Sequence, residues 1–181
     1  MSPAGWPRYV VLQQTRPNRP HEAVGSVHAV DAEMALLNAR DVHARRPQVF
    51  NAWVVRDDAV FSRTVEQLAE DDSWRDAPVP ESAAPVTYLV FQKQTQRRSM
   101  TYVTHVGAVT ARTAEEALAQ ALDSFPGEDV FVWWVIPATA IVANDADDVE
   151  SWFEPAKEKT YRQQSAYGFV GRRRQRGRRS S

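Results

Sequence analysis

The chain has 181 residues, is 43% hydrophobic and 25% charged, and contains no cysteine. These proportions are typical of globular proteins and exclude collagen-like, mucin-like and wholly disordered classes. Without cysteine there are no disulfides, thiolate metal sites or thiol nucleophiles, and a reducing, cytoplasmic location is expected. No secretory signal pattern opens the chain, and its longest strongly apolar run, residues 130–136, is far shorter than the roughly 20 residues that span a bilayer.

The formal net charge of −1 conceals two regions of opposite sign. Six of the 22 Lys and Arg residues are arginines within residues 172–181, which leaves 16 basic against 23 acidic residues, a net charge of −7, in residues 1–171. We expect residues 172–181 to form a disordered, Arg-rich tail. The alternative is a surface for nucleic acid or an acidic protein, which implies a nucleic-acid-binding or regulatory adaptor. The acidic body opposes phosphate, so nucleic acid is the less favoured partner.

The first part of the chain predicts a unit of strands around one helix. Its predicted elements are a strand at 9–14, a polar loop at 15–20, a strand at 22–29, a helix that ends before Pro47, and strands at 49–55 and 59–61. Asp31 precedes the helical pattern and is its predicted N-cap. Gly25 lies inside a predicted strand, which indicates a bulge or a close backbone approach.

Residues 62–85 are rich in Glu, Asp, Ser, Pro and Ala and predict a linker with one amphipathic turn at 65–68. The same series of elements then recurs as a strand at 86–93, a loop at 94–99, a strand at 102–111, a helix after Thr113, and strands at 130–136 and 140–142. Thr113 and Glu116 predict a full capping box, in which the Glu116 carboxylate accepts from the N–H of the cap residue.

The two units are copies of one sequence. Residues 24–42 align without a gap on residues 106–124 at an offset of 82, with ten of 19 positions identical. An offset of 81 then pairs Phe50 with Phe131 and the 53–55 run with 134–136. Self-similarity in the same order over several blocks indicates tandem repeats.

We therefore predict an α+β protein with two tandem ββαβ(β) units. The order fits a β-grasp (ubiquitin-like) roll or a split ferredoxin-like sheet, and the roll is favoured, with the units packed as a pseudo-dimer. The predicted division of the chain is a first repeat at 1–61, a linker at 62–85, a second repeat at 86–171 and the tail at 172–181.

The residues that could carry chemistry form no recognisable constellation. The four histidines, His21, His28, His43 and His105, match no metal-binding spacing, and nucleophile-elbow, dinucleotide-binding and P-loop patterns do not occur in the sequence. His28 alternates with core positions and is expected on the surface. We therefore predict no catalytic, cofactor-binding or metal-binding residue in this chain, and no cofactor. A small enzyme with a cleft between the units is the less favoured alternative.

Three of the six tryptophans, Trp6, Trp74 and Trp152, lie in polar segments outside the repeated strands. Exposed tryptophans often anchor a partner protein. The alternative is that they cap the edges of the sheets. The sequence leaves both interpretations open.

Several motifs resemble the PaaB family, the B component of phenylacetate-CoA oxygenase. They are Trp6-Pro7-Arg8-Tyr9, the Val24–Ala29 run, the helical Met34–Asp41 run, Trp53-Val54-Val55 and a closing segment, Trp152–Arg162. The opening motif lies in the first copy and the closing motif in the second, so the resemblance spans the chain as a tandem fusion.

The resemblance implies a non-catalytic, bridging component of a multicomponent bacterial monooxygenase, 1,2-phenylacetyl-CoA epoxidase, in phenylacetate degradation. In that system a separate di-iron subunit performs the O₂ chemistry, and it forms a complex with a structural subunit. Both are the partners expected here, and no membrane partner is expected. From the opening and closing motifs, the candidate partner-interface residues are Trp6, Tyr9, Trp152, Phe153, Pro155, Tyr161 and Arg162.

Overall fold

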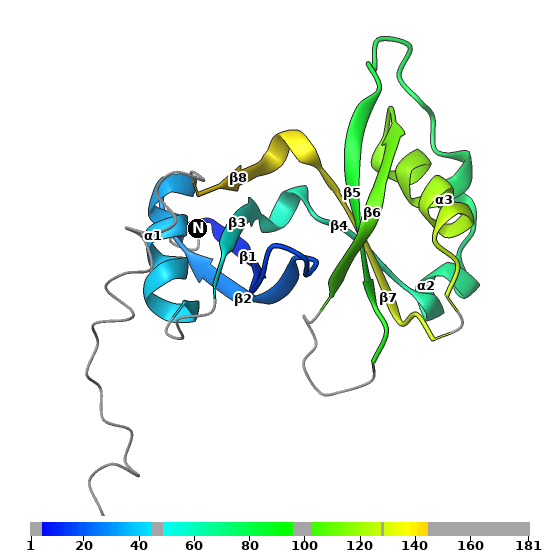
Figure 1. Ribbon diagram of the computed structural model, residues 1–181. Helices are drawn as coiled ribbons and strands as arrows, with labels where there is room; N and C mark the ends of the chain where they lie inside the picture. Colours follow the sequence, from blue (N-terminus) through cyan, green and yellow to red (C-terminus); the bar gives the residue numbers. More distant parts are fainter. Residues whose placement is uncertain (1–4, 45–48, 96–102, 128, 145–181) are drawn as a thin grey trace, which may run out of the picture.

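The computed structural model describes residues 5–44, 49–95, 103–127 and 129–144 (Figure 1). The first repeat comprises β1 (Arg8–Gln14), β2 (Glu22–His28), α1 (Ala32–His43), β3 (Asn51–Arg56), the 3-10 turn η1 (Asp57–Ala59) and β4 (Phe61–Thr64). The second comprises β5 (Val86–Lys93), β6 (Thr104–Ala111), α3 (Ala114–Ser124), β7 (Val132–Pro137), the 3-10 turn η3 (Ala138–Ala140) and β8 (Ile141–Ala143). Between them lie α2 (Val65–Glu70) and the 3-10 helix η2 (Ser73–Asp76). The α+β class is confirmed.

The predicted linker contains more regular structure than its composition suggests. The last strand of the first repeat extends to Thr64, whose hydroxyl then caps α2 by accepting from the Gln67 N–H at 3.2 Å. The Gln67 side chain accepts in return from the Thr64 N–H at 2.9 Å, which completes a capping box. The amphipathic turn predicted at 65–68 is thus part of a helix, and the longest stretch between the repeats without helix or strand is residues 77–85.

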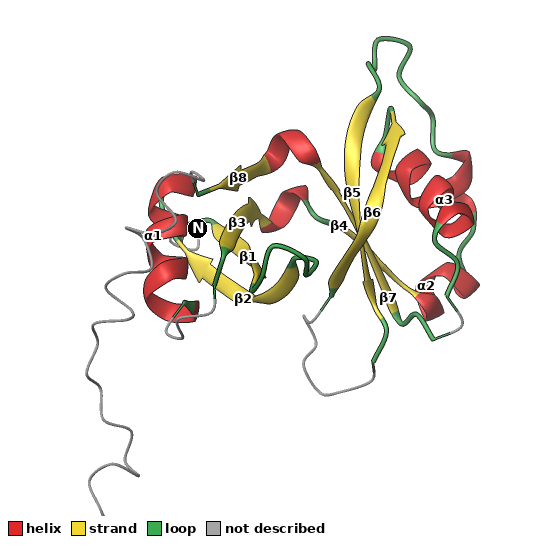
Figure 2. Cartoon of the chain, in the orientation of Figure 1, coloured by secondary structure: helices red, strands yellow, loops and turns green. Residues whose placement is uncertain are grey.

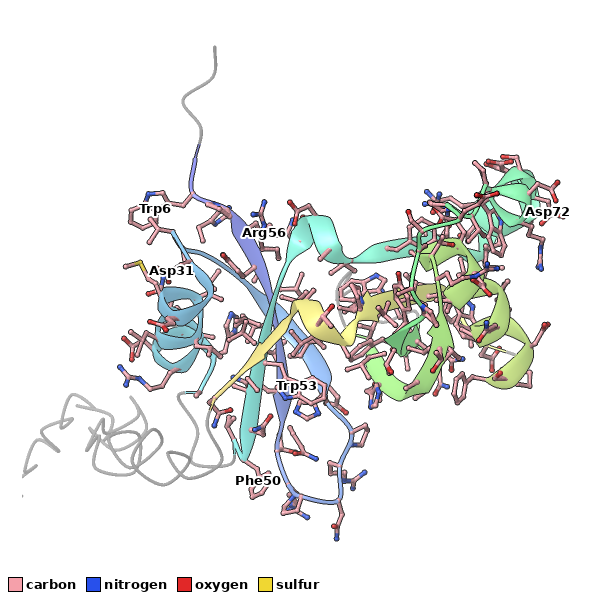
Figure 3. The ribbon with its side chains drawn as sticks, turned by 90° about the horizontal axis from the view of Figure 1, so that it is seen from above. Trp6, Asp31, Phe50, Trp53, Arg56 and Asp72 are labelled. Atoms are coloured by element: carbon pink, nitrogen blue, oxygen red, sulfur yellow. The ribbon has the colours of Figure 1, made fainter. Side chains whose placement is uncertain are left out.

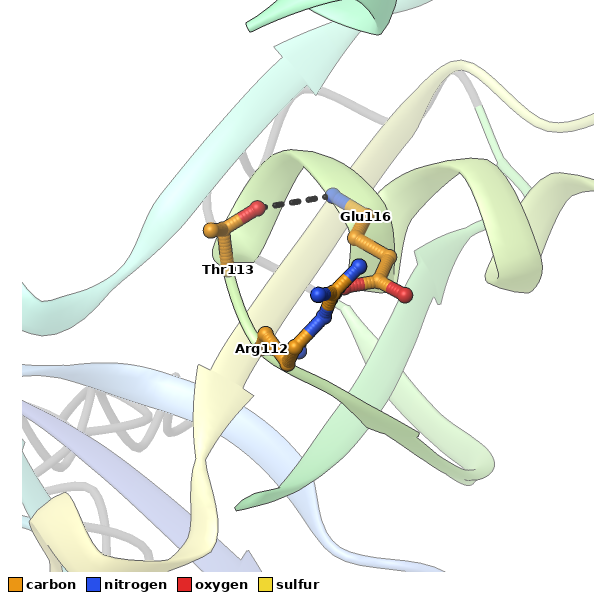
Figure 4. A network of polar contacts seen from close by, with 3 residues as sticks. All are labelled: Arg112, Thr113 and Glu116. Carbon is orange, nitrogen blue, oxygen red and sulfur yellow. Dashed lines mark hydrogen bonds and ion pairs between the residues drawn. The ribbon is translucent and has the colours of Figure 1, made fainter. Parts of the chain in front are cut away.

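The two long helices begin at the predicted caps. Asp31 accepts from the Met34 N–H at 2.8 Å, and Thr113 accepts from the Glu116 N–H at 3.2 Å. The reciprocal half of the second cap differs from the prediction, because the Glu116 carboxylate accepts from the N–H of Arg112, at 3.0 Å, and not from the cap residue (Figure 4). The Arg112 guanidinium also lies 3.4 Å from this carboxylate, and this ion pair accounts for the shift of one residue.

The strands form one eight-stranded sheet in the order β4-β7-β5-β6-β2-β1-β3-β8. All pairings among the described strands are antiparallel. The α1 crossover brings β3 back in the direction of β2, and β1 lies between them, so β3 runs antiparallel to β1. This is the split βαβ arrangement of a ferredoxin-like sheet, whereas a β-grasp roll has parallel strands at its centre. The favoured β-grasp roll is therefore not supported by these pairings.

At the midpoint of the sheet, β2 pairs with β6. Glu22 faces Thr104, which is its own counterpart at the offset of 82. Two backbone hydrogen bonds of 2.9 Å flank the pair: Ala23 N–H to the Val103 carbonyl and His105 N–H to the His21 carbonyl. Exchanging the repeats turns each bond into the other. A contact centred on equivalent residues is isologous, so an approximate twofold axis relates the repeats at this point.

Each repeat also gives its last strand to the other. β4 pairs with β7, and β8 pairs with β3. The registers are equivalent, because Phe61 faces Val135 while its counterpart Val142 faces Val54. The exchange covers the edge of the third strand in each repeat. The geometry is that of a strand-swapped dimer within one chain.

Three apolar cores follow from this arrangement. The first-repeat core, between α1 and its strands, consists of Tyr9, Val11, Val27, Ala29, Ala35, Leu36, Ala39 and Val54. The second-repeat core contains the counterparts of all eight, namely Tyr88, Val90, Val109, Ala111, Ala117, Leu118, Ala121 and Val135, and in addition Trp74, Val130 and Trp133. The central core joins the repeats and consists of Val10, Leu12, Ala23, Val55, Phe91, Val103, Trp134 and Ile136. The helices α1 and α3 therefore lie at opposite ends of the molecule, with the strands between them (Figure 2).

The equivalent glycines Gly25 and Gly107 each leave room for a ring from the neighbouring helix end. A ring at the C-terminal end of each long helix packs against a glycine of the neighbouring strand: His43 on Gly25, and Phe125 on Gly107. A Cβ added at Gly25 would lie 2.6 Å from His43 Cε1, and one added at Gly107 would meet the Phe125 ring. Gly25 also has a φ of +152°, which L-residues rarely adopt. Both features considered for Gly25, a bulge and a close approach, are present, because the β1–β2 register shifts between Val11, opposite Gly25, and Leu12. Gly107 has the same two features, with the β5–β6 shift between Val90 and Phe91.

Candidate partner interface

Trp6 lies on the surface at the start of α1. Its side chain is 58% exposed. The next residue, Pro7, accepts a hydrogen bond from the Ala29 N–H at 3.1 Å, which fixes this segment beside the chain that leads into the helix. Figure 3 shows Trp6 at the same end of α1 as the N-cap residue Asp31.

The exposed face of α1 next to Trp6 is apolar. Met34 and Leu37 are 37% and 44% exposed and lie three residues apart on one face of α1, and Val30, 49% exposed, lies just before the N-cap residue Asp31. We call Trp6, Val30, Met34 and Leu37 the α1 patch. An exposed apolar cluster on a folded protein commonly marks an interaction site.

The corresponding face of α3 has a different chemistry. The counterparts of Val30 and Met34 are Arg112 and Glu116, whose side chains form an ion pair, with the Arg112 Nε 3.4 Å from the Glu116 carboxylate. The counterpart of Leu37 is Ala119, which is only partly exposed. The apolar stripe therefore belongs to the first repeat and is not dictated by the shared fold.

Trp74 does not lie on the surface. It is 6% exposed and belongs to the second-repeat core, where η2 packs against α3. The Arg75 guanidinium carbon lies 4.7 Å from the centroid of its ring and covers the outer side. Burial excludes Trp74 as an exposed partner anchor, and its packing against α3 differs from the sheet-edge cap that was the alternative.

A cluster of aromatic rings lies at the twofold junction. His21 stacks on Trp53 with ring centroids 3.4 Å apart and an interplanar angle of 14°, and its Nε2 lies 2.9 Å from Asn51 Oδ1. His105 lies 6.3 Å from Trp53 and 5.1 Å from Phe91, between ring centroids. The junction is therefore filled by planar side chains drawn from both repeats.

Burial dominates the electrostatics of the two junction histidines. Desolvation lowers the pKa of His21 below its usual value, opposed by the hydrogen bond with Asn51, and the nearby His105 lowers it further. Desolvation also lowers the pKa of His105, opposed by a hydrogen bond to the Gly107 backbone. Its Nε2 is buried without a hydrogen-bond partner among the described residues. Both rings are thus held neutral at pH 7, and they act as packing groups.

The structure separates the predicted interface residues. Trp6 is exposed, whereas Tyr9 is only 5% exposed and packs in the first-repeat core, so its side chain is not presented to a partner. Trp152, Phe153, Pro155, Tyr161 and Arg162 lie outside the described residues. His28 is exposed, as predicted.

The described residues contain no metal-binding cluster and no membrane-spanning helix. No group of three or more His, Asp or Glu side chains there is arranged to hold a metal ion. No helix of the described part is both long and apolar enough to cross a membrane. The junction cluster was not predicted, because it depends on the pairing of Glu22 with Thr104, which brings His21 and His105 opposite each other and has no signal in the sequence.

Comparison with known proteins agrees with the repeat. Residues 5–76 and 86–174 both match the family Phenylacetic acid degradation B. A curated relative, the B component of 1,2-phenylacetyl-CoA epoxidase from Escherichia coli (strain K12), is 39% identical over 70 residues, which cover 39% of this chain and 74% of that protein. No solved structure matches the chain. The chain therefore belongs to the phenylacetic acid degradation B family, of which it carries two copies in tandem.

Proposed function

We propose that this chain is a non-catalytic component of a phenylacetyl-CoA epoxidase in phenylacetate degradation, and that it bridges the di-iron catalytic and structural subunits. The family and the identity of the relative support the assignment to such an epoxidase. No cofactor in this chain is needed for the role, because the oxygen chemistry lies in another subunit.

The observation that carries the bridging role is the mutual strand exchange. It joins the two repeats into one body through a shared central core, with α1 and α3 at opposite ends (Figure 1). A rigid body with two related end faces can hold two partner assemblies at a fixed separation. Covalent fusion keeps the two faces together at any protein concentration.

The α1 patch is the proposed contact at the first end. Trp6 contributes a large, exposed aromatic surface, and such residues supply much of the binding energy in protein interfaces. The closing-motif residues Phe153, Pro155, Tyr161 and Arg162 are proposed to complete this contact. Tyr9 contributes through the core beneath, since its side chain is buried.

Co-expression with the catalytic and structural subunits tests the proposal. We expect one copy of this chain to co-purify in a stoichiometric complex, and Trp6→Ala to weaken that complex at least tenfold in affinity. Val65→Ala is the matched control, because Val65 is an exposed apolar residue on α2, away from the α1 patch. Failure of the three chains to assemble would overturn the bridging role.

The Arg-rich tail provides the test against a nucleic-acid-binding adaptor. Deleting residues 172–181 is expected to leave the complex with the other subunits intact. A steep, salt-dependent binding to nucleic acid that disappears with this deletion would instead support the adaptor.

A further inference from the structure

The second repeat shows how this fold covers its helix. The chain that follows the exchanged strand β4 continues through α2 into η2 and places Trp74 against α3. The eight paired positions of the two helix cores are equivalent, and Trp74 is one of the three residues that only the second-repeat core contains. The covering segment therefore comes from the opposite repeat.

The first repeat lacks this cover in the described part of the chain. Only Ala32 packs as a partly buried apolar residue against its core, and the α1 patch is exposed. By the twofold relation, the segment that would cover α1 is the one that follows the exchanged strand β8. That strand already contacts α1.

The sequence after β8 shares a short motif with the sequence after β4. Ser73-Trp74 and Ser151-Trp152 align at an offset of 78, each preceded by acidic residues. Trp74 follows the end of β4 by ten residues, and Trp152 follows the end of β8 by nine. Each Ser-Trp pair also falls inside one of the two segments that match the family.

We propose that Trp152 docks on the helical part of the α1 patch of its own chain, at Met34 and Leu37, and leaves Trp6 exposed, as Trp74 docks on α3. Nine extended residues reach about 30 Å, so the connection from β8 is long enough. Trp152 is then a cap, and the closing motif that starts at Phe153 emerges beside Trp6. The inference concerns the chain alone and stands whether or not the bridging function holds.

The two repeats differ both in the helix surface and in the residue that follows the docking tryptophan, and the two differences complement each other. Where the second repeat has Arg112 before the N-cap of α3 and Glu116 in its first turn, the α1 patch has Val30 and Met34. Where Arg75 covers Trp74, the residue after Trp152 is Phe153. The apolar face thus meets two adjacent aromatic residues, Trp152 and Phe153, which complement it better than the charged Arg75 would.

Hydrogen exchange of the full chain gives the first test. Trp152→Ala is expected to accelerate amide exchange in residues 32–43 at least tenfold and to leave residues 114–124 unchanged. Trp74→Ala is the matched control and is expected to act on residues 114–124 alone. Unchanged exchange in α1 on loss of Trp152 would overturn the proposal.

Crosslinking gives a second test, in which Trp152 itself is retained. Because the chain has no cysteine, Leu37→Cys with Ser151→Cys forms a unique pair for a short bis-maleimide. The equivalent pair Ala119→Cys with Ser73→Cys is the positive control, and Thr87→Cys with Ser151→Cys is the negative control. We expect rapid intramolecular crosslinking of the first pair. Crosslinked dimers, or an intramolecular yield equal to that of the negative control, would overturn the proposal. So would hydrogen exchange in which the amides of α1 become protected only when partner subunits are added.

Discussion

Glu22 of β2 pairs directly with Thr104 of β6, and each is the counterpart of the other in the repeat. The pairing places an approximate twofold axis inside a single chain. On either side of it the repeats exchange β4 and β8. The paired strands therefore hold the repeats together in addition to the covalent connection at 77–85.

Cutting that connection tests the exchange. A protease site inserted between Ala83 and Ala84, in a segment without helix or strand, is expected to be cleaved without separating the halves. The fragments should co-elute in gel filtration at micromolar concentration and separate only in denaturant. Their separation under native conditions would show that the shared core and exchanged strands do not hold the repeats together.

Trp74 and Trp6 provide a matched pair of tryptophans, one buried and one exposed. Trp74→Ala leaves a large cavity in the second-repeat core and is expected to lower the free energy of unfolding by about 3–5 kcal/mol. Trp6→Ala is expected to change it by less than about 0.5 kcal/mol. Urea denaturation of both variants measures the difference, and equal effects would contradict the burial of Trp74.

The junction histidines are expected to make the protein sensitive to acid. Their pKa values are lowered in the folded state, while those of the unfolded chain lie near 6.5. The stability that depends on their neutral form is therefore full above pH 6.5. It falls as the pH drops below 6.5 toward the lowered values, and because both rings are only partly shielded from solvent, the slope is less than the limit of about 1.4 kcal/mol per pH unit for each histidine.

Substitution separates this effect from general acid denaturation. His105→Phe removes one buried titrating group and is expected to reduce the loss of stability between about pH 6.5 and 5. His28→Gln is the control, because it also replaces a histidine but at an exposed position outside the junction cluster. Thermal melts over this range measure both, and an unchanged acid sensitivity in His105→Phe would refute the assignment.

Gly25 and Gly107 both exclude alanine because a ring lies too close, but Gly25 has a second reason in its backbone conformation. Gly25→Ala and Gly107→Ala are each expected to destabilise the protein by about 1–3 kcal/mol, because the added methyl meets His43 or Phe125. Phe125→Ala should relieve most of the Gly107→Ala clash, whereas His43→Ala should relieve only part of Gly25→Ala, since Gly25 also has its positive φ. Double-mutant cycles measure the two coupling energies, and equal relief in both repeats would contradict this distinction.

Local patterns predicted the local elements well. Asp31 and Thr113 cap the helices as their sequences indicate, and both glycines mark close approaches. The exchange of β4 and β8 was not predicted, because it pairs residues 68 to 90 positions apart in strands of only three or four residues. Such short strands carry almost no periodic signal.

The candidate interface was harder to predict than the fold. Tyr9 belongs to a conspicuous motif, yet its place in β1 directs it into the first-repeat core. Trp74 lies in a polar segment, yet tertiary packing buries it. In both cases the exposure of the side chain depends on a neighbouring helix or strand, so it cannot be predicted from the composition of the residue's own segment.

Fusion of the repeats has a consequence for how their end faces can diverge. In a symmetric homodimer any substitution appears on both ends at once, so a change that suits one partner must also be tolerated by the other. In this chain Val30 and Met34 at the start of α1 coexist with Arg112 and Glu116 at the start of α3, within an otherwise equivalent scaffold. Each end can therefore specialise independently for its own binding surface.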